Sequence, residues 1–235
     1  MKRLHREDLA FADRVAMWRQ SSRILGGADA RGAWTAFRKS APFRPILTAL
    51  KSSAGTRQRC MYCCDSRSCD VDHFIPMALD PTKTMSWRNL LWVCTDCNRR
   101  KGARFDPDLI NPFESDPWRH FVFVEASGEI APRWIDRFTE DRSARATFSI
   151  LPALGHEAVT EGRRRTYVRL RSAAEAWLRS PGDRHLREDL VRAFREDEFG
   201  VGAWVLAYEG RQQPPWPSAR AVDPDLVRRL QALCC

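Results

Sequence analysis

The sequence contains no long hydrophobic run. Its longest apolar stretch, GVGAWVLAY at residues 200–208, is far too short to span a bilayer. The first residues, MKRLHREDLAFADRV, carry charges throughout and lack the apolar centre of a secretory signal. Internal repeats and low-complexity segments are also absent, which excludes a solenoid, a collagen-like chain and a wholly disordered one. We therefore expect a globular protein in the cytoplasm.

The composition is that of a folded chain with a basic surface. Hydrophobic residues make up 43% of the 235 residues, enough to form a core, and the net charge is +9. Such a charge fits a polyanionic partner, because Lys and Arg release counterions when they bind phosphate. A solvated, arginine-rich surface explains the same charge without any partner.

Hydrophobic periodicity divides the chain into three predicted parts. Residues 1–55 are predicted to form a helical region, in which helix begins at about residue 5. Asp29 is predicted to cap a short helix that runs through Phe37. Residues 56–106 follow the order strand, loop, strand, helix, with VDHFIPMA and WRNLLWVC as the strands. Residues 107–235 hold a hairpin and further helices. The predicted fold class is therefore α+β.

The third part is predicted to contain a hairpin, several helices and a linker. HFVFVEASGEIAPRW (120–134) alternates around Ser-Gly and predicts a β-hairpin. Residues 156–180, LREDLVRAFRE and DPDLVRRLQALCC predict helices. QQPPWPSA (212–219) is rich in proline and is interpreted as an exposed linker.

Two pairs of cysteines have the spacing of a metal site. The eight cysteines are Cys60, Cys63, Cys64, Cys69, Cys94, Cys97, Cys234 and Cys235. Cys60 with Cys63 and Cys94 with Cys97 form two Cys-x-x-Cys knuckles, which predict four thiolate ligands for one structural Zn²⁺. Cys64 is an alternative to Cys63, although equal spacing in the two pairs favours Cys63. The cysteines at the C-terminus have no partner motif.

Between and after the knuckles lies a second pattern. Asp72-His73-Phe-Ile-Pro follows the first pair, Asn89-Leu precedes the second, and Asn98-x-x-Lys101 comes directly after it. Together with the knuckles, this order resembles the HNH endonucleases, whose fold is the ββα-metal core. The resemblance covers about residues 58–104. It departs from the common family pattern at Asn98, where many members carry histidine.

The resemblance implies a role for each of these residues. Asp72 and Asn98 would bind the catalytic ion, and an asparagine oxygen favours Mg²⁺ or Mn²⁺ over Zn²⁺. His73 would be the general base that takes a proton from the attacking water, since a neutral imidazole suits that task at cellular pH. Asn89 would hold the loop between the strands and the backbone of His73. Because neighbouring side chains on a strand point to opposite faces, a bend would have to bring Asp72 and His73 to one site.

Basic residues near the predicted helix are candidates for binding nucleic acid. Arg100, Lys101 and Arg104 would meet phosphate near the helix start, and GRRRTYVRLR (162–171) could follow a phosphate backbone. Each set is equally explained as a solvated helix face. Asn98, too, has an alternative role as a helix cap.

A looser resemblance extends to about residue 130. WRNLLWVCTDCNRRKG, LINPFESDPWRHFVF and SGEI look like the PtuB-like HNH subunits of Septu and related retron anti-phage systems, which work with a partner ATPase. The leading hypothesis is a metal-dependent HNH nuclease of a defence system, acting on nucleic acid, with DNA favoured over RNA. The alternatives are a stand-alone restriction-type HNH nuclease and a non-catalytic zinc module that binds nucleic acid. No membrane partner is expected.

Overall fold

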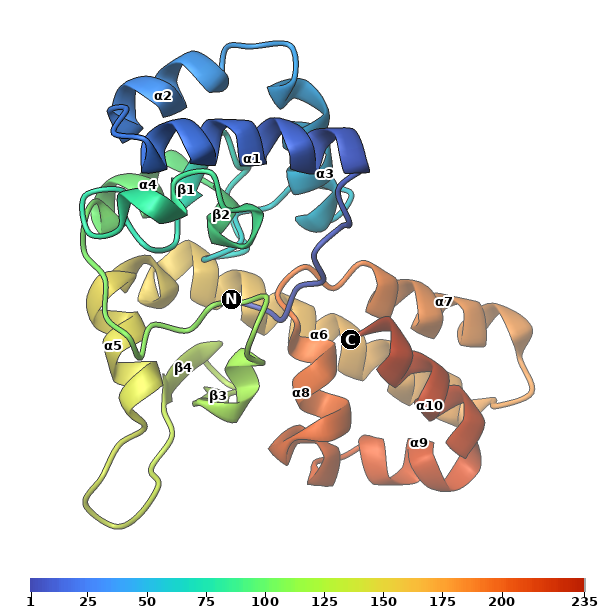
Figure 1. Cartoon of the computed structure of the whole chain (residues 1–235). Helices are drawn as coiled ribbons and strands as arrows, with labels where there is room; N and C mark the ends of the chain where they lie inside the picture. Colours follow the sequence, from blue (N-terminus) through green and yellow to red (C-terminus); the bar gives the residue numbers. More distant parts are fainter. Residues whose placement is uncertain (235) are drawn as a thin grey trace.

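The computed structural model describes residues 1–234. Three helices open the chain: α1 (Phe11–Leu25), α2 (Ala30–Phe37) and α3 (Phe43–Ser53). Asp29 caps α2 as predicted, because its Oδ2 accepts the backbone N–H of Gly32 at 2.6 Å. In Figure 1 these helices lie together over the short sheet that follows them.

The first ten residues have no regular secondary structure, so the prediction of helix from residue 5 is wrong there. The Leu4 N–H donates to the carbonyl of Pro112 at 2.8 Å. The Arg6 guanidinium donates to the carbonyls of Trp87 at 2.8 Å and Leu90 at 3.0 Å. These tertiary hydrogen bonds hold the segment against distant parts of the chain, and sequence periodicity carries no signal for them.

A ββα unit lies under the N-terminal helices. Strands β1 (Asp70–His73) and β2 (Leu90–Val93) pair antiparallel, with Asp72 opposite Leu91, and α4 (Thr95–Lys101) follows directly. The connection from β1 to β2 contains the 3₁₀ turns η1 (Pro81–Lys83) and η2 (Trp87–Asn89). All four side chains of β2 are buried, since α3 covers the strand.

The second half of the chain begins with a hairpin and ends in helices. Strands β3 (Phe121–Val124) and β4 (Glu129–Pro132) pair antiparallel around a turn closed by Gly128, whose φ is +78°. The remaining elements are η3 (Pro117–Arg119), α5 (Arg142–Ile150), η4 (Pro152–Gly155), α6 (Glu157–Arg179), α7 (Arg184–Arg195), α8 (Val201–Ala207), η5 (Glu209–Gln212), α9 (Trp216–Val222) and α10 (Pro224–Leu233). The long α6 is the axis of this half and contacts β4, α7, α8 and α9. The structure thus confirms an α+β fold with a ββα unit between helical regions.

The interpretation of residues 212–219 as an exposed linker is wrong. Helix α9 begins at Trp216, whose side chain is buried and packs edge-on to Phe194 at 5.8 Å between ring centroids. Proline lacks a backbone N–H, but the first turn of a helix needs none. The prolines therefore lie at the start of a packed helix. The tryptophan among them was the residue in this segment that indicated burial.

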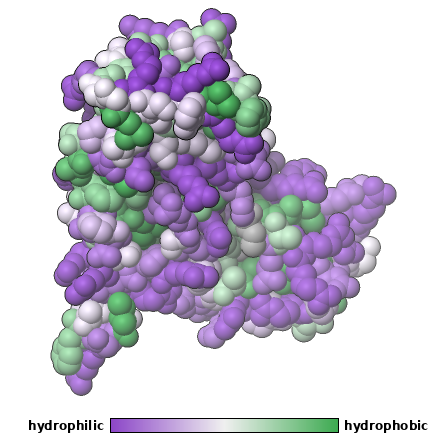
Figure 2. Space-filling view, viewed as in Figure 1, coloured by the Kyte–Doolittle hydropathy of each residue, from purple (hydrophilic) through white to green (hydrophobic). Residues whose placement is uncertain are grey.

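The face of the molecule seen in Figure 2 is mostly hydrophilic. A loop between β4 and α5 projects from the body and carries exposed Trp134, Ile135 and Phe138. Within residues 1–234 no helix is both long and apolar enough to cross a membrane. Cys235, for which the sequence predicted no partner, lies outside the described residues.

Candidate functional site

The four cysteines of the two knuckles converge. The Sγ atoms of Cys60, Cys63, Cys94 and Cys97 all lie within 4.8 Å of one another, and those of Cys63 and Cys94 are 3.9 Å apart. A tetrahedral Zn²⁺ with Zn–S bonds of about 2.3 Å needs sulfurs about 3.8 Å apart. All four residues are buried. The donor set and its spacing fit a structural zinc ion.

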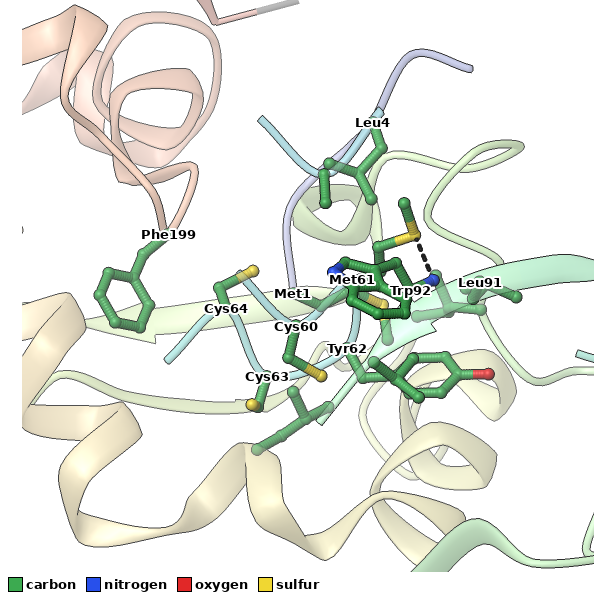
Figure 3. Close-up of a cluster of buried hydrophobic side chains, with 14 of the residues drawn as sticks. Met1, Leu4, Cys60, Met61, Tyr62, Cys63, Cys64, Leu91, Trp92 and Phe199 are labelled. Atoms are coloured by element: carbon green, nitrogen blue, oxygen red, sulfur yellow. Dashed lines mark hydrogen bonds between the residues drawn. The ribbon is translucent and has the colours of Figure 1, made fainter. Parts of the chain in front are cut away.

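The structure separates Cys63 from its neighbour Cys64. Cys64 has a φ of +64°, and Figure 3 shows its thiol turned away from those of Cys60 and Cys63. Cys69 is exposed, with its Sγ 2.9 Å from the Thr95 hydroxyl. The cluster therefore contains Cys63, as the spacing favoured.

One arginine, Arg163 of α6, is buried and interacts electrostatically with the cysteine segment. Arg163 of α6 donates from Nε to the Gly128 carbonyl and from Nη2 to the Leu154 carbonyl, both at 2.8 Å. Its Nη1 is buried without a partner among the described residues. Burial lowers the pKa of Arg163 to about 10, and negative charge on Cys64 and Cys63 opposes that change. A buried cation with a free N–H fits an anionic metal–thiolate cluster, which carries excess negative charge.

The other arginines of GRRRTYVRLR contact acidic side chains of the protein. Arg164 and Arg165 pair with Glu161, Arg169 with Glu196 and Arg171 with Glu175. These contacts favour the interpretation of the segment as one face of a helix. The special position of Arg163 among them could not be recognised from the sequence.

Three of the predicted catalytic residues line one pocket of about 490 Å³. Asp72 and His73 come from the end of β1, and Asn98 comes from the middle of α4. Three consecutive residues of β1, Val71, Asp72 and His73, line this pocket, so both predicted residues border it although neighbouring side chains on a strand alternate in direction. The far wall of the pocket belongs to α2.

The imidazole of His73 is fixed from two sides. Its Nε2 lies 2.9 Å from the Thr84 carbonyl, an acceptor, so Nε2 carries the hydrogen and Nδ1 keeps its lone pair. The Trp34 indole stands edge-on to the ring, with centroids 4.6 Å apart and planes at 76°. Burial lowers the pKa of His73 to about 4, so the ring is neutral at cellular pH. A neutral, oriented imidazole is what a general base requires.

Asn89 holds the loop that orients His73. Its Oδ1 accepts the Ile75 N–H at 2.7 Å, and its Nδ2 donates to the carbonyls of Ile75 at 3.0 Å and Lys83 at 3.1 Å. Lys83 directly precedes Thr84, whose carbonyl accepts from His73. Asn89 thereby connects the segment after β1 to the loop that fixes the imidazole.

Asp72 lines the pocket, and its carboxylate contacts two fully buried polar side chains behind it. The Tyr62 hydroxyl donates to its Oδ2 at 2.7 Å, and the Lys101 ammonium lies 3.1 Å from the same oxygen. Burial raises the pKa of the Asp72 carboxyl, and Lys101 and Tyr62 act against that change. Tyr62 lies inside the first knuckle, where the sequence analysis assigned it no function.

Asn98 lies within α4 and does not cap the helix. The cap is Cys94, whose Sγ accepts the Cys97 N–H at 3.5 Å. The Asn98 Nδ2 donates to Asp70 Oδ2 at 3.3 Å, which leaves its Oδ1 as the atom available to a hard cation. Asp70 was missed by the sequence analysis. Strand alternation could have identified it, because residues two apart on β1 share a face.

The three cations proposed for phosphate binding all contact other groups of the protein, although only Lys101 is buried. Lys101 is fully buried and also donates to the His73 carbonyl at 2.7 Å. Arg100 pairs with Asp96 at 2.8 Å. Arg104 donates to the carbonyls of Ser149 at 3.2 Å and Ile150 at 3.0 Å. Their contact with nucleic acid remains a prediction.

Comparison with known proteins agrees with this geometry. The family model for HNH endonuclease matches residues 58–104, which include both cysteine pairs and the pocket residues of β1 and α4. Over 73 residues the chain is 36% identical to the Septu protein PtuB of Bacillus thuringiensis, a match that covers 28% of this chain and 28% of that protein. The similarity thus spans less than a third of the relative. Residues 58–104 of this chain are an HNH endonuclease domain.

Proposed function

We propose that the chain is a metal-dependent endonuclease that hydrolyses phosphodiester bonds of nucleic acid, with DNA as the favoured substrate. One observation carries this proposal: Asp72, His73 and Asn98, from two elements, line a single pocket. A carboxylate and an amide oxygen beside a neutral imidazole are the groups that such hydrolysis needs.

Each residue has one task in the proposed reaction. His73 accepts the proton of the attacking water at Nδ1, while its Nε2–H stays on the Thr84 carbonyl. Asp72 and the Oδ1 of Asn98 would hold Mg²⁺ or Mn²⁺. When bound, the ion supplies positive charge for the phosphate oxygens and the leaving 3′ oxygen. Asn89 positions His73 through the loop at Lys83 and touches no substrate.

The Zn²⁺ of the cysteine cluster has a structural task in this proposal. Four thiolates complete a tetrahedral site and leave no position for water or substrate. The cluster joins the segment before β1 to the start of α4, and so it holds together the two elements that carry the pocket residues.

The likeness to a Septu protein supports a role in anti-phage defence. We propose that the chain is the nuclease of such a system and that it works with a partner ATPase. Cleavage by the chain alone should then increase when the product of a neighbouring ATPase gene is added. An ATPase that neither binds the chain nor changes cleavage would contradict the partnership and leave the nuclease proposal standing.

The deciding experiment is cleavage of plasmid DNA and of total RNA with Mg²⁺, Mn²⁺ or EDTA. His73→Ala should abolish cleavage, as should EDTA. His185→Ala is the matched control, because it removes an exposed imidazole on α7. Both variants should keep their zinc and their fold. Equal cleavage by His73→Ala and wild type would contradict the proposed chemistry.

One observation favours a second candidate, a zinc module that binds nucleic acid without cutting it. The Asp72 carboxylate already contacts the ammonium of Lys101. If that contact excludes a divalent ion, wild type will bind nucleic acid and show no metal-dependent cleavage, with or without the ATPase.

A further inference from the structure

Helix α2 contributes a wall to the pocket of His73. Arg31, Trp34 and Thr35 of this helix and its C-cap residue Arg38 line the same pocket as the residues of β1 and α4. Positions separated by three, four and seven residues lie on one face of a helix, so the two arginines flank Trp34 on the side that looks into the pocket. The helix precedes residues 58–104 and lies outside the HNH domain.

Packing fixes α2 over the site. Trp34 is buried between His73, at 4.6 Å, and Phe43, at 5.4 Å between ring centroids. Phe37 packs on the same Phe43 ring at 5.6 Å. The Asp29 cap closes the other end of the helix. The positions of the two arginines relative to the imidazole are therefore set by the folded core.

The two arginines differ from the other cations near the site. Both are exposed, and within residues 1–234 neither guanidinium makes a hydrogen bond or an ion pair with the protein. Lys101, Arg100 and Arg104, by contrast, are held by protein groups. Arg31 and Arg38 are thus the pocket's cations that are free to bind an anion.

The chemistry of the pair indicates the ligand. A guanidinium binds phosphate oxygens through two parallel hydrogen bonds and keeps its charge at all relevant pH values. Seven helical residues place the two Cα atoms about 10 Å apart. A nucleic-acid strand carries a phosphate at every nucleotide, so a strand crossing the pocket presents more than one phosphate over that length.

We propose that Arg31 and Arg38 bind backbone phosphates on either side of the phosphodiester that faces His73. The inference rests on the proposed nuclease function and assigns the strand's path across the domain: along α2, over the pocket. Because both contacts are to phosphate, they hold the strand and read no bases.

The test measures binding and requires no cleavage. Every protein carries His73→Ala, so that the labelled DNA duplex stays intact. The parent is compared with Arg31→Gln/Arg38→Gln and with the control Arg195→Gln/Arg229→Gln. The control removes the same charge from exposed arginines of α7 and α10, two helices that contribute no residue to the pocket. Affinity is measured from about 50 mM to about 200 mM salt.

The α2 variant should bind at least about tenfold more weakly at low salt, since each lost contact is a charged hydrogen bond. Its slope of log affinity against log salt should shrink by about 1.8, which is about 0.9 for each lost phosphate contact. The control should keep the parent's slope. Equal slopes for the α2 variant and the control would overturn the inference alone. A parent that binds neither the duplex nor labelled single-stranded DNA or RNA would overturn the proposed function and this inference together.

Discussion

The ammonium of Lys101 lies 3.1 Å from the carboxylate of Asp72, and both side chains are buried. The pair joins α4 to β1, and its Asp72 member lines the pocket of His73 and Asn98. Removing one member of a buried pair leaves an uncompensated charge, which costs about 3–5 kcal/mol. We therefore expect Lys101→Met and Asp72→Asn each to lower the free energy of unfolding by that amount. Urea unfolding of each variant and of wild type measures this difference in the free energy of unfolding.

The double variant Asp72→Asn/Lys101→Met tests whether the two residues act as a pair. It removes both charges together, so its loss should be clearly smaller than the sum of the two single losses. Additive losses, or single losses below about 1 kcal/mol, would show a pair no stronger than one at the surface.

Neighbouring cysteines give a matched test of the metal centre. Cys63→Ser removes a thiolate from the cluster, whereas Cys64→Ser removes a buried thiol that is turned away from it. We expect the first variant to lose bound zinc and much of its stability, and the second to retain one zinc per chain. Metal analysis of the purified proteins decides between them. Loss of zinc from both variants to the same extent would contradict the assignment of Cys63.

Arg163 should stabilise the fold through its buried contacts. Arg163→Met keeps a long side chain but leaves the Gly128 and Leu154 carbonyls without a donor, at about 1–3 kcal/mol for each. It also removes a buried cation whose charge interacts with Cys63 and Cys64. We expect lower stability and faster loss of zinc to a chelator than in wild type. Arg165→Met, on the exposed side of α6, is the control and should change neither.

The local parts of this fold could be predicted from the sequence, and the contacts between distant parts could not. The Asp29 cap, the Cys-x-x-Cys spacing and the apolar pattern of each strand are signals carried within a few residues, and the structure contains all three features. The non-helical first residues and the packing of Trp216 in α9 depend on partners far along the chain, which no periodicity encodes. The same distinction holds in the site. The residues of β1 and α4 follow a motif, but the α2 wall is visible only once Trp34 is seen against His73.

The burial of His73 predicts a dependence of stability on pH. Its pKa is about 4 in the folded chain, below the ordinary value of 6.5, so the unfolded chain takes up this proton first as the pH falls. The contribution of the neutral His73 imidazole to the free energy of unfolding is therefore fully present above about pH 6.5. It is lost toward pH 4, by about 1.4 kcal/mol per pH unit at most. His73→Gln lacks this group. The difference in unfolding free energy between wild type and the variant should narrow by about 3 kcal/mol over that range.

Urea unfolding of the two proteins at a series of pH values measures this difference. Both proteins keep the same cysteine cluster and the same carboxylates, so the pH dependence of those groups cancels. His185→Gln controls for the loss of a histidine as such, because its ring is exposed on α7. A difference between wild type and His73→Gln that stays constant from neutral pH to pH 4 would mean that burial does not hold the imidazole neutral.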